Sequence, residues 1–175
     1  MKEILAIINQ IIKEHKVILQ HAAELEQVAN DAEALTTLDK AMEVYMPGRL
    51  DQNQGFQKFR DLHVRLEEGL KTHFHREETQ LLAAFQNHGD DKLLDSLRTL
   101  LIEHKDIRNR LDQEKRYVAD LNTGQLSRHV WEATAHDMRA HITHTRKLLE
   151  AHAEIEQELL NTLRKEITEA QKGKS

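Results

Sequence analysis

Apolar residues recur along this chain at the three- and four-residue spacing of amphipathic α-helices. Four long segments show this pattern, and they run roughly over residues 2–30, 50–87, 91–120 and 126–170. Residues that break helices separate the segments: Pro47-Gly48, His88-Gly89-Asp90 and Asn122-Thr123-Gly124. Residues 31–46 are also expected to be helical, either as a continuation of the first segment or as a separate short helix.

Four such segments joined by short turns predict an all-α fold, an up-down-up-down four-helix bundle with a metal site in its core. One proline and six glycines in a chain rich in Leu, Ile, Ala, Glu and Lys agree with this fold. A length of 175 residues predicts a single domain over residues 1–175. We expect its core to span about residues 2–165 and the polar C-terminal tail to fray.

Composition excludes several classes of function. The formal charge of −5 is spread along the chain without a basic block, which argues against nucleic acid or an anionic membrane as a partner. The absence of cysteine excludes disulfides, thiolate metal sites, iron–sulfur clusters and a cysteine nucleophile. The apolar N-terminal segment carries charges at helical spacing and does not resemble a signal peptide. No stretch is long and apolar enough to span a bilayer, so the expectation is a soluble, cytoplasmic protein.

Histidine and glutamate interrupt the apolar stripes of all four segments. Each half of the chain has a Glu-His-Lys triplet followed by a His-x-x-x-Glu pair, and the second pair follows the first after 79 residues. A His and a Glu four apart share one helix face, so the two pairs and the two triplet histidines can converge inside a bundle. The six candidate metal ligands are His15, His73, Glu77, His104, His152 and Glu156.

A metal cluster is the simplest way to satisfy these six groups. A buried His or Glu without a partner costs several kcal/mol, and six nitrogen and oxygen ligands suffice for two metal ions. A His/carboxylate set without sulfur suits iron and tolerates manganese or zinc. One His on an apolar stripe is more often a hydrogen-bonded core residue, and His63 with Glu67 is a third His-x-x-x-Glu pair. The repeat of the whole set favours metal binding over these alternatives.

A second polar layer near one end of the bundle is a further hypothesis. His63 and His141 precede the two paired histidines by ten and eleven residues, about 15 Å along a helix. Glu26 and Glu114 reach a comparable height on the neighbouring helices. The layer would serve as a water-filled access route or a secondary cation site, and the alternative is an exposed bundle end with ordinary surface histidines.

The order of the six residues resembles the haemerythrin-like (HHE cation-binding) family, as do the phrases His73-Phe74-His75-Arg76-Glu77-Glu78 and Ile102-Glu103-His104-Lys105. The resemblance covers nearly the whole chain and implies a non-haem di-iron centre with an oxo or hydroxo bridge. It further implies that both glutamates of the set bridge the two iron ions and that the four histidines are terminal ligands.

Two positions depart from the oxygen-carrying haemerythrins, which have a further His on the third helix and end in a His-x-x-x-x-Asp motif. Here Arg108 and Gln157 occupy those positions. The symmetric set of four His and two Glu resembles instead the di-iron proteins that repair iron centres and the members that sense iron or oxygen.

The expected function is a di-iron protein that reacts with or senses O₂, peroxide or NO, or handles iron under oxidative or nitrosative stress. Its partners would be small diatomic or peroxide ligands, and the chain would act as a monomer or a homodimer. One alternative is an oxygen storage or carrier protein, and another is a structural bundle with the metal as a staple. A bundle binding haem through His63 and His141 is a remote fourth. Outside the cluster no side chain has the character of a nucleophile or a dedicated general base.

Overall fold

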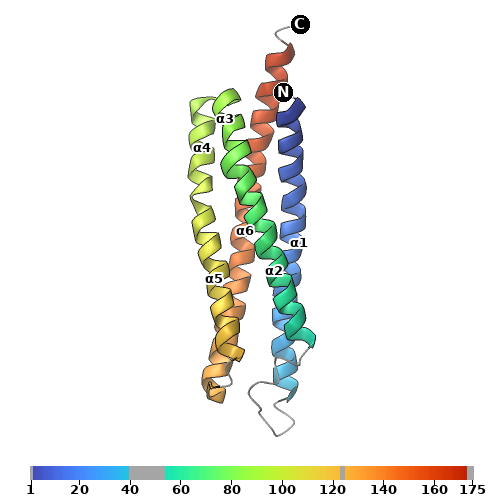
Figure 1. The fold of residues 1–175 in the computed structure, drawn as a ribbon, viewed down its shortest axis with the longest axis vertical. Helices are drawn as coiled ribbons and strands as arrows, with labels where there is room; N and C mark the ends of the chain where they lie inside the picture. The colour runs from blue at the N-terminus through green and yellow to red at the C-terminus, as the bar shows by residue number, and fades with distance from the viewer. Residues whose placement is uncertain (1, 40–53, 123–124, 173–175) are drawn as a thin grey trace. The chain divides into compact units, whose positions relative to one another are not determined.

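The computed structural model describes the backbone of residues 2–39, 54–122 and 125–172, and the burial of side chains within residues 2–31, 57–121 and 125–170. All regular structure in these ranges is helical, which confirms the all-α prediction. Figure 1 labels the α-helices: α1 (Lys2–Asp39), α2 (Gln54–Arg76), α3 (Leu82–His88), α4 (Asp91–Leu101), α5 (Glu103–Asn122) and α6 (Arg128–Lys172). A π-helix, η2 (Glu77–Leu81), joins α2 to α3 without a break.

The first helix continues to Asp39, in line with one of the two alternatives expected for residues 31–46, while residues 40–46 and Pro47-Gly48 lie outside the described residues. The other helix boundaries differ from the sequence expectation in two places. The third segment is interrupted at Ile102, so that it forms α4 and α5. At the C-terminal end, α6 continues to Lys172 and Ile167 is buried, so the helix and the apolar core extend beyond residue 165.

The turn between α3 and α4 follows the predicted breaker at residues 88–90. The Gly89 amide donates to the carbonyl oxygen of Phe85 at 2.9 Å and ends α3. The Asp90 side chain then accepts a hydrogen bond of 2.7 Å from the Leu93 amide, as an N-cap does. The two helices therefore lie side by side, joined by two residues (Figure 1).

The chain divides into two compact units, which are described separately. Unit one comprises the described parts of residues 1–19, 68–107 and 148–175, and unit two those of residues 20–67 and 108–147. Across the described part of the chain, no helix has the length and apolarity needed to cross a membrane.

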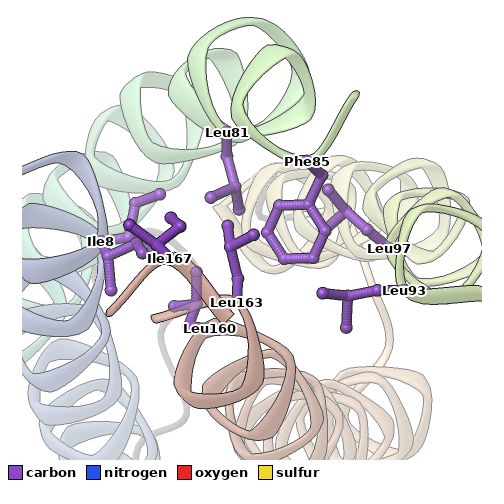
Figure 2. Packing of buried hydrophobic residues seen from close by; sticks show 9 residues of the cluster. Ile8, Leu81, Phe85, Leu93, Leu97, Leu160, Leu163 and Ile167 are labelled. Carbon is purple, nitrogen blue, oxygen red and sulfur yellow. The ribbon is translucent and has the colours of Figure 1, made fainter. Parts of the chain in front are cut away.

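Unit one has an apolar cluster built from α1, η2, α3, α4 and α6, in which the side chains point toward one another (Figure 2). Burial of each large aliphatic or aromatic side chain contributes about 1.5–3 kcal/mol relative to its exposure. The cluster is formed by Ile8, Ile11, Leu81, Phe85, Leu93, Leu97, Leu160, Leu163 and Ile167.

Unit two has a core of its own, with buried apolar residues on α1, α2, α5 and α6. These include Leu25, Phe59, Leu66, Leu111 and Ile142. Beside these apolar side chains, three polar residues are buried in the described part of unit two: His63, Glu114 and Thr145.

Candidate metal centre

The six candidate ligands all lie in unit one, on α1, α2, η2, α5 and α6, and all are buried. Each occupies the inner stripe of its helix, which is why the apolar period of the sequence picked it out. Glu77, His104 and Glu156 are fully buried, at 0 % exposure. The structure therefore brings together every residue of the predicted set.

The ligand atoms form two groups that share one carboxylate. Within each group, the nitrogen and oxygen atoms lie within 4.8 Å of one another. The first group is His15, His73, Glu77 and Glu156, and the second is Glu77, His104 and His152. Glu77 belongs to both, so its two oxygens are placed to bridge two cations. Glu156 lies with the first group alone, and its role as a second bridge, which the family resemblance implies, stays a prediction.

The shared position of Glu77 is visible in its contacts. Its Oε1 lies 2.6 Å from Nε2 of His73, and its Oε2 lies 2.9 Å from Nε2 of His104. Glu77 is also the first residue of the π-helix, which the sequence analysis missed. A π-turn contains one residue more than an α-turn and is frequent at functional sites. It changes the direction in which the side chains from Glu77 onward project.

Eight buried polar atoms of these candidate ligands make no hydrogen bond of good geometry among the described residues, although several lie close to one another. They are Nδ1 and Nε2 of His15, both carboxylate oxygens of Glu77 and of Glu156, and Nε2 of His104 and of His152. Leaving a buried polar atom unsatisfied costs about 1–3 kcal/mol. Cations held by these nitrogen and oxygen donors would satisfy them together, so the residues fit a centre of two metal ions.

Three further carboxylates lie outside the ligands and were not anticipated from the sequence. Each accepts a hydrogen bond from Nδ1 of one ligand imidazole, which leaves Nε2 free to face the cluster. We call them the outer carboxylates: Glu14 bonds His73 at 3.0 Å, Glu78 bonds His104 at 2.8 Å, and Glu103 bonds His152 at 3.0 Å. Glu14 also pairs with Arg76. Each is the sequence neighbour of a ligand, and that adjacency was the available signal.

An aromatic ring and a small cavity complete the surroundings of the ligands. Phe74 is buried and stacks on His104 with ring centroids 3.8 Å apart and planes 15° apart. The cavity has room for about one water-sized molecule. Histidines and apolar side chains line it: His15, Ile18, Leu19, Leu70, His73, Phe74, Leu149, His152 and Ala153.

Without a metal ion, the burial and the charges of the cluster together favour the protonated forms of His15 and Glu156. Burial lowers the pKa of His15, but the carboxylates of Glu156 and Glu77 outweigh it and raise that pKa to about 9. Burial raises the pKa of Glu156 to about 7, and the like charge of Glu77 adds to the effect. The pKa of Glu77 is well below its ordinary value, because three imidazoles outweigh its burial. Metal binding would displace these retained protons.

The proposed second polar layer lies in unit two, and its four residues do not form one site. His63 and Glu114 are buried together, with Nε2 of His63 3.1 Å from Oε2 of Glu114. Glu26 instead accepts a hydrogen bond from Thr143 and pairs with Arg146. Nε2 of His141 lies 3.2 Å from the carbonyl oxygen of Arg110. No group of three metal-ligating side chains forms among the described residues of unit two.

Comparison with known families gives one match. The model of the Hemerythrin HHE cation binding domain matches residues 6–163, a range that contains all six candidate ligands. No curated protein and no solved structure matches the chain.

Proposed function

The chain belongs to the haemerythrin HHE cation-binding family, and from this premise we propose that it is a non-haem di-iron protein. It reacts with or senses O₂, peroxide or NO, or handles iron under oxidative or nitrosative stress. Membership of a cation-binding family agrees with the buried His/Glu groups of unit one. The observation that carries the proposal is the position of Glu77 in both ligand groups.

One iron ion would be held by His15, His73 and Glu156 and the other by His104 and His152, and Glu77 would contribute to both. Iron is preferred because imidazole and carboxylate donors without sulfur suit it, and manganese or zinc would be tolerated. We further infer an up-down-up-down bundle, since the connection between α3 and α4 is only two residues long.

The chain's own residues account for access to the site. The small cavity lies beside three of the ligand histidines, and apolar side chains form most of its remaining wall. Such a wall admits a diatomic molecule while limiting water. Iron would supply the affinity for O₂, peroxide or NO, while the protein fixes coordination and access.

An oxygen carrier is the second candidate, and one observation favours it. The first ligand group offers four side chains and the second only three. A carrier needs one saturated and one open iron position, and this inequality supplies an asymmetry of that kind. The positions occupied by Arg108 and Gln157 still separate the chain from the carriers' ligand pattern.

The test is metal analysis of anaerobically purified protein, with optical spectra before and after addition of O₂ and of NO. We expect two iron ions per chain and spectral changes with either gas. Reversible O₂ binding would favour the carrier, whereas silence toward both gases with metal-dependent stability would favour a structural staple.

A double variant tests the ligand assignment. Glu77→Ala with Glu156→Ala is expected to abolish the binuclear centre and leave a helical apo-protein. His63→Ala with Glu114→Ala removes a buried His–Glu pair from unit two, and it is the matched control that keeps its iron. Unchanged iron content in the first variant would refute the assignment.

A further inference from the structure

The outer carboxylates follow the repeat of the chain, with one exception. In each half, the glutamate of the Glu-His-Lys triplet bonds the histidine of the His-x-x-x-Glu pair: Glu14 bonds His73, and Glu103 bonds His152. Glu78 is the residue that follows the glutamate of the first His-x-x-x-Glu pair. It bonds His104, the histidine of the second Glu-His-Lys triplet. Three of the four candidate ligand imidazoles thus have an outer carboxylate hydrogen-bonded to Nδ1.

His15 is the exception. Repetition of the pattern would have the residue after Glu156 bond Nδ1 of His15. That residue is Gln157, and its side-chain amide instead donates to Asn161 on the same helix at 3.2 Å. Nδ1 of His15 is consequently buried with no hydrogen-bond partner among the described residues.

An outer carboxylate orients its imidazole and makes it a stronger donor, and loss of such a partner commonly weakens metal binding about 10- to 100-fold. His15 lacks this outer carboxylate, and its Nε2 has an alternative partner within the site. Its Nε2 lies 2.8 Å from Oε2 of Glu156, and its ring borders the small cavity. Release of His15 from a cation would therefore need no large rearrangement.

Resting on the proposed two-metal centre, we propose that His15 is the exchangeable ligand of the site. It yields its coordination position to a small anion or diatomic molecule in the adjacent cavity. The outer carboxylates keep His73, His104 and His152 in place. The side chains of the second ligand group then stay in place, and the first group is the half in which a side-chain ligand exchanges.

The test loads the whole chain with Co²⁺ and uses azide as the small-anion probe, followed in the visible spectrum. At the first ligand group of the wild type, azide competes with His15 for a coordination position, so its binding there is weak. His15→Ala is expected to retain two Co²⁺ per chain and to bind azide about 10-fold tighter or more at that group, because no imidazole competes. His104→Ala, the matched change at the repeat-related histidine, is expected to lose one Co²⁺.

A second pair of variants leaves every ligand in place. Glu78→Gln removes the outer carboxylate of His104 and is expected to make that histidine displaceable, which tightens azide binding with two Co²⁺ retained. Gln157→Ala is the matched control and is expected to leave azide affinity unchanged.

The outcomes separate the two proposals. A wild-type chain that binds fewer than two Co²⁺ would overturn the proposed di-iron centre and this inference with it. Two Co²⁺ with equal azide affinity in the wild type and Glu78→Gln, or a His15→Ala chain that loses a metal ion as His104→Ala does, would overturn the inference alone.

Discussion

Replacement of Glu156 by leucine should change stability in opposite directions with and without metal. Glu156 is fully buried, and the contact of its Oε2 with Nε2 of His15 lacks good hydrogen-bond geometry. In the absence of a cation, its carboxylate pays for desolvation and lies close to the like charge of Glu77. Leucine has a similar volume and removes both penalties.

The magnitude follows from the burial. Hydrophobic replacement of a complete buried ion pair is often neutral or stabilising by about 1–4 kcal/mol, whereas removal of one partner leaves the other uncompensated. In Glu156→Leu, His15 loses its 2.8 Å contact with Glu156 but keeps Glu77 as a partner, 3.7 Å from its Nε2. We therefore expect Glu156→Leu to stabilise the apo-protein by only about 1 kcal/mol, at the low end of that range.

With metal present, the same substitution removes a ligand. A cation at one hundred times its dissociation constant stabilises the folded state by about 2.7 kcal/mol. Loss of one bound ion would therefore reverse the sign and leave the loaded variant less stable than the loaded wild type. For a chain of this length, each kcal/mol moves the melting temperature by about 2–4 °C.

The assay is urea unfolding followed by far-ultraviolet circular dichroism, once with a chelator and once with Zn²⁺ in excess. Glu156→Gln is the matched control, because it removes the charge and the metal ligand but leaves a buried polar amide. It should share the loss with Zn²⁺ and show a smaller gain without it. A Glu156→Leu chain destabilised to the same extent in both conditions would refute the reasoning, since the carboxylate would then stabilise the fold by itself.

Two further predictions concern pH and the turn between α3 and α4. The pKa values of His15 and His73 are raised above the ordinary 6.5, that of His15 to about 9, because the carboxylates beside them outweigh burial. The two protonated histidines contribute fully to the stability of the apo-protein below pH 6.5, and this contribution is lost as the pH rises toward about 9. The midpoint of urea unfolding, measured with a chelator, should therefore fall between pH 7 and 9. A midpoint that rises over this range would contradict the prediction. Asp90→Ala removes the N-cap hydrogen bond to Leu93 and should cost about 1 kcal/mol in the free energy of unfolding. Asp95→Ala, at an exposed position of the same helix, should stay within about 0.5 kcal/mol, and equal losses in the two variants would argue against a capping role.

The three- and four-residue spacing of the apolar residues predicted most of the fold. A stripe that repeats every three or four residues records which face of a helix avoids water, whatever lies opposite. Ile8, Leu97 and Leu163 belong to this apolar stripe, and all three are buried. It also placed the six candidate ligands on inner faces, because a polar residue in such a stripe needs a partner in the core.

The same period could not anticipate features that depend on neighbouring helices. A residue next to a ligand in sequence projects about 100° away from it around the helix. Glu14, Glu78 and Glu103 therefore turn toward an adjacent helix, and only the packing decides which imidazole each one meets. The split of the second polar layer has the same origin, since Glu26 finds Arg146 and Thr143 within reach.

The sequence by itself determined the helices, their buried faces and the set of six candidate ligands, because these follow from local periodicity and from the cost of burying polar atoms. Only the tertiary structure decided how the set divides into two groups, that Glu77 is shared by both, and that His15 lacks the outer partner of the other three. Those features depend on distances between helices. Local spacing along a chain does not encode such distances.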